Sequence, residues 1–292
     1  MAKGRELKGR IRTVENTRKI TRTMEMVATS KMKRAQDRVI AARPYANSLA
    51  EVISSLYSPE LAERFRLLRQ PAKIENAAVI LLTSNRGLAG GFNANLIREA
   101  RKLLKQHDDA GAKTMLRIVG RKGLGYFRYV GREIESSRTD FTDRPTVGNA
   151  AELVDDLIGK FERGELDAVD IVYAKFNSAL STPPATLRIL PVPPPAEDAA
   201  KKGGLRHDYL LFPSADAILE QLLPLYVRNS VYRALVETAA AEQGARRTAM
   251  KNATDKAGDI INVLRRTYNR ALQAQITQEI AEIVGGSAAL EG

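Results

Sequence analysis

The stretch ENTRKITRTMEMVATSKMKRAQDRVIAA, Glu15 to Ala42, decides the fold of this chain, because its apolar and small residues recur every three or four positions. The same spacing continues on both sides, over residues 3–57, and no glycine follows Gly9 in that range. A stripe this narrow is typical of a long helix that pairs with another helix. Pro44 removes one backbone hydrogen bond and predicts a bend that does not end the helix. The predicted seam consists of Leu7, Ile11, Val14, Thr17, Thr21, Met24, Ala28, Met32, Ala35, Val39, Ala42, Ala46, Leu49, Ile53 and Leu56.

A second helix with the same kind of stripe is predicted near the other end of the sequence. Ser214 is a plausible N-cap, and helical spacing continues to Val284, where Gly285 and Gly286 predict the end of the helix. Alanine is frequent in this stripe, and small side chains let two helix backbones approach closely. The predicted seam consists of Met250, Ala253, Ala257, Ile260, Leu264, Tyr268 and Ala271.

The residues between the two helices predict a sheet. Five short apolar runs read as strands, at residues 77–83, 114–120, 133–141, 168–176 and 185–192. Helical stretches at residues 94–106, 122–129 and 150–163 separate the early strands. This alternation favours a mainly parallel sheet that is covered on both faces.

Together these patterns predict an α/β fold combined with a coiled coil, in which a Rossmann-like α/β domain is inserted between two antiparallel terminal helices. We expect an N-terminal coiled-coil helix at residues 1–58 and the α/β domain at residues 74–195. A solvated, Pro-rich linker is expected at residues 196–212, before a C-terminal helix and tail at residues 213–292.

The predicted lengths of the two helices differ. At a rise of 1.5 Å per residue, a helix over residues 3–57 spans about 80 Å and one over residues 214–284 about 105 Å. The C-terminal helix should therefore extend beyond its partner by roughly 25 Å. The apolar stripe of Ile276, Ile280 and Ile283 lies in that overhang, where the chain itself offers nothing to cover it.

The composition excludes several kinds of site. The 292 residues include no cysteine, which excludes disulfides and thiolate metal sites, and two histidines, His107 and His207, are too few for a metal cluster. A lone histidine in a polar stretch is expected to be solvated. The longest apolar run, residues 77–82, is far shorter than the roughly 20 residues of a membrane-spanning helix. The charged first residues predict no secretory signal, so we expect the chain to stay in the compartment where it is made.

The net charge of +12 is concentrated near the N-terminus, where the first 60 residues hold 13 Lys and Arg against 6 Asp and Glu. Nucleic acid, acidic lipid or an acidic protein surface would each suit such a patch. The basic helix superficially suits the major groove of DNA, but it lacks a cluster of base-reading side chains and its seam continues through the basic part. The favoured interpretation is the charged outer face of a coiled coil, and nucleic-acid binding is the alternative.

The stretch SNRGLAGGFN, Ser84 to Asn93, follows a strand and opens a helix, which is where phosphate-binding loops occur. Its glycines fit neither the dinucleotide fingerprint nor the Walker loop. The favoured interpretation is a tight turn that needs glycine, and a nucleotide site is the alternative. No Ser, His and Asp set suggests catalysis, so we expect no catalytic residue, no cofactor and no metal.

Four stretches carry a more specific signal: KITRTMEMVATSKMKRAQ (19–36), SNRGLAGGFN (84–93), RRTAMKNATDKAGDII (246–261) and TYNRALQAQITQEIAEIVGGSAAL (267–290). They resemble, in order and over essentially the whole chain, the signature segments of the gamma subunit of F-type ATP synthases. The resemblance implies that the terminal helices form the coiled-coil shaft of a rotor. Such a shaft couples proton flow to ATP synthesis or hydrolysis, and the nucleotide chemistry belongs to the beta subunits.

The resemblance also implies the partners and the location. The shaft would stand inside a ring of alpha and beta subunits, with the α/β domain beside the epsilon subunit and the membrane ring of c subunits. The chain would then be a peripheral subunit on the cytoplasmic face of a bacterial plasma membrane, with the equivalent organelle membrane as the alternative. It would touch the membrane only through the complex and would bind no nucleic acid.

Candidate partner-binding residues follow from the matching motifs. By resemblance, Met24 faces the acidic lever loop of the beta subunit, with Lys31 and Arg34 nearby, although Met24 equally suits a seam residue. Tyr209 would lie near the ring-facing base. At the tip, polar residues would meet a beta-subunit loop and isoleucines would lie in an apolar sleeve. The tip residues are Gln273, Ile276, Thr277, Glu279, Ile280, Glu282 and Ile283.

The chain departs from the family pattern at two of these places. Leu272 stands where relatives usually have an arginine, so one charged contact beside Gln273 is expected to be missing. Phe212 replaces an acidic residue, which weakens the expectation for Tyr209. The thiol switch of chloroplast gamma subunits is excluded, because the chain has no cysteine.

Overall fold

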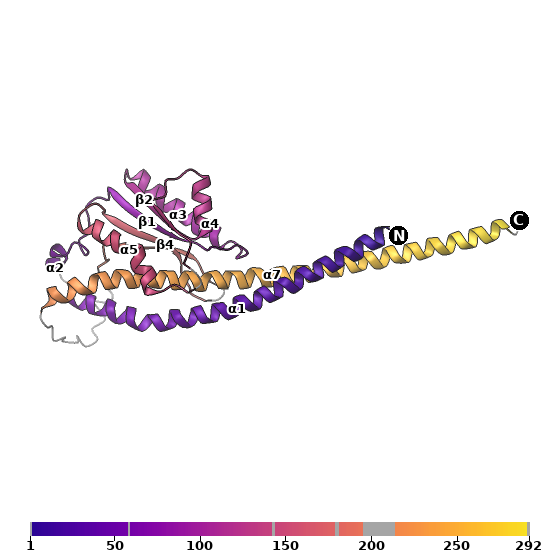
Figure 1. Cartoon of the computed structure of the whole chain (residues 1–292), viewed down its shortest axis with the longest axis horizontal. Helices are drawn as coiled ribbons and strands as arrows, with labels where there is room; N and C mark the ends of the chain where they lie inside the picture. Colours follow the sequence, from indigo (N-terminus) through magenta and orange to yellow (C-terminus); the bar gives the residue numbers. More distant parts are fainter. Residues whose placement is uncertain (1, 58, 142–143, 179–180, 195–213, 291–292) are drawn as a thin grey trace. The chain divides into compact units, whose positions relative to one another are not determined.

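The computed structural model describes residues 2–57, 59–141, 144–178, 181–194 and 214–290. Contacts divide the chain into two compact units. The coiled-coil unit consists of residues 1–27 and 247–292, and the sheet unit consists of residues 28–246. Two long helices, α1 (Ala2–Leu56) and α7 (Ala215–Leu290), each contribute residues to both units (Figure 1). The expected linker, residues 196–212, lies outside the described residues, as do His207, Tyr209 and Phe212.

The sheet unit contains a five-stranded sheet in the order β3-β2-β1-β4-β5. The strands are β1 (Asn76–Leu82), β2 (Lys113–Val119), β3 (Ser136–Arg138), β4 (Ala168–Ala174) and β5 (Pro184–Leu190). All neighbouring pairs are parallel except β4 and β5, which are antiparallel. The prediction of a mainly parallel, Rossmann-like sheet is therefore confirmed. Strand β3 is shorter than the run at residues 133–141 suggested, because only three residues pair with β2 at this sheet edge.

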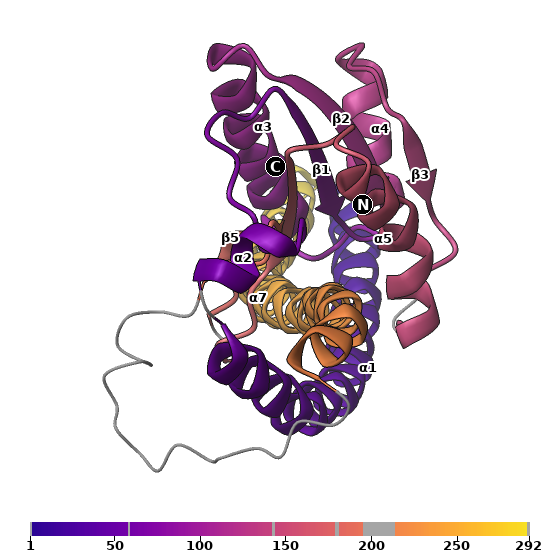
Figure 2. The same cartoon turned by 90° about the vertical axis from the view of Figure 1, so that its left-hand side faces the viewer.

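Helices cover both faces of the sheet, and alternate residues of each strand point to opposite faces. Residues Val79 and Leu81 of β1 pack against α3 (Phe92–Asp109) and α4 (Arg121–Tyr129), whereas Ile80 and Leu82 join the cluster that contains α5 (Val147–Glu162). Figure 2 shows this layering. A short helix, α2 (Pro59–Arg64), had no predicted counterpart.

The two long helices contribute to both of these cores within the sheet unit. Leu49 and Ile53 of α1 belong to the α5 cluster, together with the residues of α7 from Leu219 to Leu235. Val236, Ala240 and Ala241 of α7 belong instead to the cluster of α3 and α4. Helix α7 therefore passes from one core to the other near Val236. Pro44 and Pro224 lie inside their helices without ending them.

The coiled-coil unit pairs the beginning of α1 antiparallel with the end of α7. The Thr21 and Thr254 hydroxyls share a hydrogen bond of 2.8 Å, and Arg265 Nη2 donates to Glu15 Oε1 at 2.6 Å. Residue numbers rise along α1 while they fall along α7 in these pairs, as the antiparallel prediction requires. In α1 the predicted seam faces inward except at Thr17, which is exposed and whose hydroxyl donates to Thr13 O.

In α7 one member of the predicted seam is wrong. Ile260 is 42% exposed, and the buried residue at this turn is Ile261, at 3%. The least exposed residue at each turn follows an alternation of four and three positions, which places Thr254 and Ile261 in the seam, while the predicted Ala253 lies half-buried beside Thr254. Thr254 is tolerated there because its hydroxyl is satisfied by Thr21 and by Met250 O. The seam residues with this spacing are Met250, Thr254, Ala257, Ile261, Leu264, Tyr268, Ala271 and Gln275, and Ala253 and Gly258 are half-buried beside them.

Helix α7 extends beyond α1 in the coiled-coil unit. A side chain placed at Gly4, near the start of α1, would come within 4.0 Å of Tyr268. Helix α7 then continues to Leu290, a further stretch of about 33 Å at 1.5 Å per residue. The expected overhang was roughly 25 Å. The predicted stop at Gly285 and Gly286 is wrong, because the helical backbone runs through both glycines despite their poor helix propensity.

Candidate functional site

The overhanging end of α7 presents an apolar stripe with no cover in the coiled-coil unit. Its members Leu272, Ile276, Ile280, Ile283 and Val284 are between 44% and 71% exposed. All side chains from residue 276 to residue 286 are exposed. Contiguous exposed apolar residues mark interaction sites in soluble proteins. The structure thus places Ile276, Ile280 and Ile283 together on a surface that is available to a partner.

The polar candidates at the tip interact only within the helix. Thr277 Oγ1 donates to Gln273 O at 3.0 Å, an ordinary bond between residues four apart. Gln275 Nε2 donates to Glu279 Oε1 at 2.8 Å, and Gln278 Nε2 donates to Glu282 Oε1 at 2.9 Å. Exposed bonds of this kind stabilise a helix by only tenths of a kcal/mol, so a partner can replace them.

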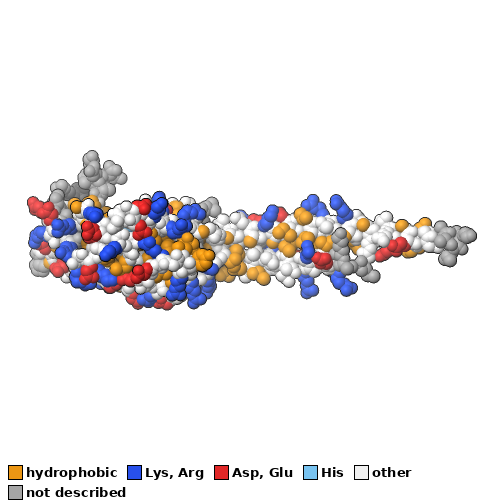
Figure 3. Space-filling view, turned by 90° about the horizontal axis from the view of Figure 1, so that it is seen from above, with side chains coloured by type: hydrophobic (Ala, Val, Ile, Leu, Met, Phe, Trp, Pro, Cys, Tyr) orange, Lys and Arg blue, Asp and Glu red, His pale blue; other side chains and the backbone are white. Residues whose placement is uncertain are grey.

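Met24 lies half-buried in the seam of the coiled-coil unit, as its seam interpretation predicted. The neighbouring apolar residues Ile20, Met26 and Val27 are 50–60% exposed and were not among the predicted site residues. The sequence could have indicated them as candidates, because they are large apolar residues that lie outside the predicted seam. Figure 3 shows exposed apolar and basic side chains along the helices.

Lys31 and Arg34 belong to the part of α1 in the sheet unit. Arg34 is exposed, and its Nη2 donates to Ser30 Oγ at 3.4 Å, one helical turn away. Lys31 is half-buried. The predicted site residues therefore divide between the two units, with Met24 and the tip in the coiled-coil unit. Tyr209 lies outside the described residues.

The loop after β1 uses its polar atoms to cap helix α4. The backbone N–H groups of Arg121 and Lys122 donate to Asn85 Oδ1 at 3.0 Å and to Ser84 O at 3.1 Å. The N–H of Gly123 donates to Thr83 Oγ1 at 3.0 Å. These are the donors that a phosphate group would use at a helix N-terminus. The same loop leads into α3, where Ser84 N–H donates to Asn93 Oδ1 at 3.0 Å and Asn95 N–H donates to Gly91 O at 2.9 Å. Because the protein satisfies these groups itself, the geometry favours the tight turn over a nucleotide site.

Close approach of the backbone explains the glycine that precedes α4. Gly120 has φ +99, and a Cβ there would lie 2.1 Å from Thr83 O. Asn85 fixes the other side of the turn, because its Nδ2 donates to Thr139 O at 2.9 Å and to Phe141 O at 3.1 Å. The loop, β2 and the segment after β3 are thus held as one rigid corner.

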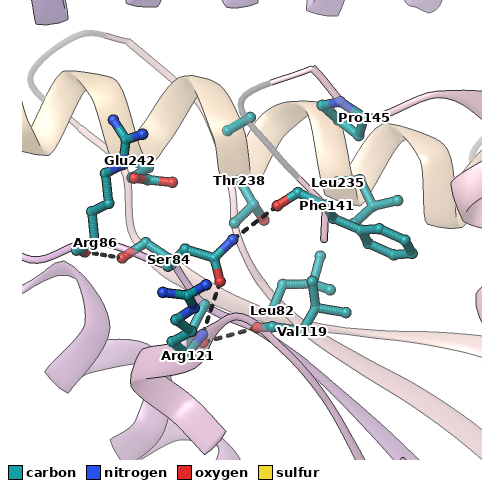
Figure 4. A pocket seen from close by; sticks show the side chains of 13 residues that line it. Leu82, Ser84, Arg86, Val119, Arg121, Phe141, Pro145, Leu235, Thr238 and Glu242 are labelled. Carbon is teal, nitrogen blue, oxygen red and sulfur yellow. Dashed lines mark hydrogen bonds between the residues drawn. The ribbon is translucent and has the colours of Figure 1, made fainter. Parts of the chain in front are cut away.

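A pocket of about 260 Å³ remains beside this corner. Its walls are the ends of β1 and β2, the loop from Ser84 to Arg86, and residues Leu235, Thr238 and Glu242 of α7 (Figure 4). Arg246 Nη2 donates to Glu242 Oε1 at 2.7 Å and to Gly87 O at 3.3 Å, which ties the loop to α7. The pocket is thus a gap between the carboxyl edge of the sheet and α7.

His107 corrects the expectation of a solvated histidine, because it is only 6% exposed. It lies at the end of α3, where its Nε2 is 3.1 Å from Oδ2 of the buried Asp170 on β4. Arg188 on β5 donates to both carboxylate oxygens of Asp170, at 2.7 and 3.0 Å. Burial alone would raise the pKa of Asp170, but the bonds from His107 and Arg188 outweigh burial and lower that pKa.

Comparison with known sequences shows which family shares this architecture. The sequence model of the family described as ATP synthase matches residues 3–290. The ATP synthase gamma chain of Gemmatimonas aurantiaca is 65% identical over 292 residues, with all of both chains covered. That of Frankia casuarinae is 41% identical over 98% of this chain and 97% of its own. This chain belongs to the ATP synthase gamma-chain family.

Solved structures agree with the fold of this gamma chain. A chain of the central stalk and c-ring structure of Tetrahymena thermophila mitochondrial ATP synthase superposes with a TM-score of 0.61. It is 27% identical, and the match covers 80% of this gamma chain and 99% of that chain. A chain of the Euglena gracilis mitochondrial enzyme gives a TM-score of 0.70 over 99% of this gamma chain and 95% of its own, at 20% identity. The resemblance noted in the sequence is confirmed, and no relative supports the nucleic-acid alternative.

The described residues include neither a membrane-spanning helix nor a metal-binding cluster. None of the described helices is both long enough and apolar enough to cross a membrane. Among the same residues, no group of three or more His, Asp or Glu side chains is placed to hold a metal ion.

Proposed function

We propose that this gamma chain is the turning shaft of a bacterial ATP synthase, and that its tip rotates inside a sleeve of partner subunits. The bare end of α7 supports this proposal most strongly. A helix that exposes an apolar stripe over several turns is stable in water only when something covers the stripe. The apolar stripe suits a bearing, because apolar contacts are not directional and do not by themselves resist rotation.

The partners follow from the family. Alpha and beta subunits would surround the coiled-coil unit, and the epsilon subunit and the c-ring would contact the sheet unit, with Tyr209 near the ring. The gamma chain would lie on the cytoplasmic face of the plasma membrane as a peripheral subunit. It would contribute no catalytic residue, and the beta subunits would bind and convert the nucleotides. The functional segments would be residues 1–58, 74–195, 196–212 and 213–292.

Individual residues would serve this coupling in different ways. Met24, Lys31 and Arg34 would meet the acidic lever loops of the beta subunits, since basic and apolar side chains suit such loops. Ile276, Ile280 and Ile283 would fill the sleeve. The polar residues Gln273, Thr277, Glu279 and Glu282 would bond a beta-subunit loop in some orientations only. Contacts that differ between orientations are what coupling between distant sites requires.

Reconstitution with alpha and beta subunits tests the proposal. We expect the wild-type gamma chain to co-purify with them and to raise their ATP hydrolysis. An Ile280→Asp variant should assemble more weakly, because it places a charge in the apolar sleeve. Ala274→Asp, at an exposed position outside the apolar stripe, is the matched control and should assemble normally.

Two outcomes would contradict the proposal. One is a gamma chain that folds but does not join the alpha and beta subunits. The other is equal assembly of the Ile280→Asp and wild-type chains, which would show that no apolar sleeve covers the tip. Binding of DNA at low salt without any assembly would favour the nucleic-acid alternative instead.

A further inference from the structure

The sheet has an opening between β1 and β4 at their carboxyl ends. The two strands pair only from Ala77 with Ala168 to Leu81 with Val172. Pairing with β4 ends at Leu81, whereas the ladder with β2 continues to Thr83, whose N–H donates to Val119 O at 2.8 Å. Strand β4 therefore continues past the end of β1. In doubly wound sheets this place, where the strand order reverses, is the crevice that receives the ligand.

Two backbone donors of the β4 segment face this opening. On the other side of β4, Lys175 N–H donates to Pro183 O, which continues the ladder with the β5 side. Successive N–H groups of an extended chain point in opposite directions, so those of Ala174 and Phe176 point toward the space that β1 has left. Buried N–H groups without a partner are costly, and a bound ligand commonly supplies that partner at such a crevice.

Helix α7 supplies the partners instead. Phe176 N–H donates to Glu237 Oε2 at 3.1 Å, and Ala174 N–H donates to Thr238 Oγ1 at 3.3 Å. Glu237 is 2% exposed, and its second oxygen accepts from Arg233 Nε at 2.8 Å. The two side chains lie at the point where α7 passes from one core to the other. The charged carboxylate is thus buried but fully bonded.

Elsewhere in the sheet unit α7 is held by apolar packing, by the exposed ion pair of Arg228 with Asp155 on α5, and by Arg246, whose Nη2 donates to Gly87 O. The bonds of Glu237 and Thr238 differ from these because they join α7 to the backbone of the β4 segment. Val236, Ala240 and Ala241 pack in the cluster of α3 and α4. Apolar contacts hold surfaces together but are not directional, so small side chains permit a helix to slide or turn about its axis. Bonds from a buried charge to fixed backbone N–H groups specify one register, even where they add little net stability.

We propose that Glu237 and Thr238 form a latch that occupies the ligand crevice of the Rossmann-like sheet and fixes the rotation of α7 against it. On this proposal, the sheet unit receives its own shaft helix where a related fold would receive a nucleotide. Glu237 is a positioning residue: it holds α7 so that turning the sheet unit turns the helix. This latch rests on the proposed shaft function, because only a rotating chain needs it to resist torque.

Hydrogen exchange of the full chain tests the latch itself. In a Glu237→Ala variant, the amides of Ala174 and Phe176 should exchange about tenfold faster or more. Phe176 N–H loses its acceptor, and Ala174 N–H is bonded to Thr238, the residue next to the substitution. The matched control is Asp155→Asn, which removes an exposed ion pair between α5 and α7, where Arg228 Nε donates to Asp155 Oδ1 at 2.7 Å. The control should leave both amides unchanged. Equal exchange in Glu237→Ala and wild type would overturn the latch.

The ratio of proton pumping to ATP hydrolysis in the assembled enzyme tests whether the latch transmits torque. In inverted membrane vesicles, Glu237→Ala should lower proton pumping per ATP hydrolysed at least twofold while hydrolysis continues, because α7 slips against the sheet. Glu237→Gln should restore most of the ratio, since its amide oxygen can still accept from Phe176 N–H. If Glu237→Ala fails to fold, Thr238→Val removes one bond at almost constant volume and should lower the ratio in the same direction.

The two proposals fail in different ways. If wild-type chain does not assemble with alpha and beta subunits, the shaft function is wrong. If wild type assembles and pumps normally but the faster-exchanging variants keep the wild-type pumping ratio, the shaft function stands and the latch does not transmit torque.

Discussion

Gly120 is the residue on which the corner between β2 and α4 depends. Replacing it with alanine forces a side chain into the left-handed region at φ +99 and against Thr83 O. We expect Gly120→Ala to lower the free energy of unfolding by at least about 2 kcal/mol. Gly125, within α4, has nothing within 4 Å of its Cβ position, so Gly125→Ala should be neutral or stabilising. Urea denaturation compares the two, and equal losses would contradict this account.

Asp170 makes the stability of the sheet unit dependent on pH. Its lowered pKa means that the folded protein favours the carboxylate over the acid. That stabilisation is complete above the ordinary pKa of a carboxyl group, about 4, and is lost as the pH falls through the lower folded value. Asp170→Asn should therefore lower the free energy of unfolding at pH 7 by several kcal/mol, because Arg188 and His107 lose a charged acceptor.

Denaturation curves at several pH values check the prediction for Asp170. The difference in stability between wild type and Asp170→Asn should shrink as the pH is lowered from 5 toward 2. A difference that stays constant over this range would show that the native bonds to His107 and Arg188 do not depend on the charge of Asp170.

The burial of His107 could not be predicted from the sequence. The polar surroundings of His107 in the sequence indicated a solvated side chain, whereas its partner Asp170 comes from a strand 63 positions away. A pair of this kind depends on strand order, which local patterns do not contain. The turn at SNRGLAGGFN was predictable, because glycine freedom and failed phosphate motifs are local properties.

The seam of α7 provides a prediction at the scale of the element. Ile261 is buried against α1 while Ile260 is 42% exposed, although the two residues have the same side chain. Ile261→Ala should therefore cost about 2–4 kcal/mol and Ile260→Ala less than about 1 kcal/mol. Thermal unfolding of the full chain, followed by circular dichroism, distinguishes the two. Equal shifts in melting temperature would place the seam elsewhere.

The elements themselves were largely predictable, and the errors have physical causes. Every long helix and all five strands have a counterpart in the sequence patterns, because helical and strand periodicities differ. The seam of α7 was misplaced because apolar content was preferred over a strict alternation that admits Thr254. The end of α7 was misplaced because glycine is a weak stop signal when no capping structure follows it.

At the scale of the molecule, the tip should be separable from the sheet. The side chains from residue 276 to residue 286 are exposed and support nothing in the coiled-coil unit. Truncation after Thr277 should therefore weaken assembly or torque and leave the melting temperature of the sheet unit unchanged. Calorimetry of the truncated chain measures the second part. A large fall in that melting temperature would mean that the tip stabilises the sheet unit.

The partners at the tip could be inferred only through the family. The residues show an uncovered apolar stripe, but nothing within the sequence specifies the surface that covers it. The resemblance of Gln273, Thr277, Glu279 and Glu282 to family positions supplied that inference, and their roles stay predictions. The latch at Glu237 was not predictable, because it depends on where β1 leaves β4.

The composition of the coiled-coil unit determines when it can form during synthesis. It joins residues 1–27 with residues from 247 onward. Thr21 therefore cannot bond to its partner Thr254 until 233 further residues have been made. At about 5–20 residues per second, a ribosome needs roughly 10–45 s to make the intervening chain. During that interval the seam of α1 before Ala28 has no native partner. The shaft is therefore the last part of the chain to fold, and a ribosome that stalls before α7 releases a product whose open seam chaperones and proteases can recognise.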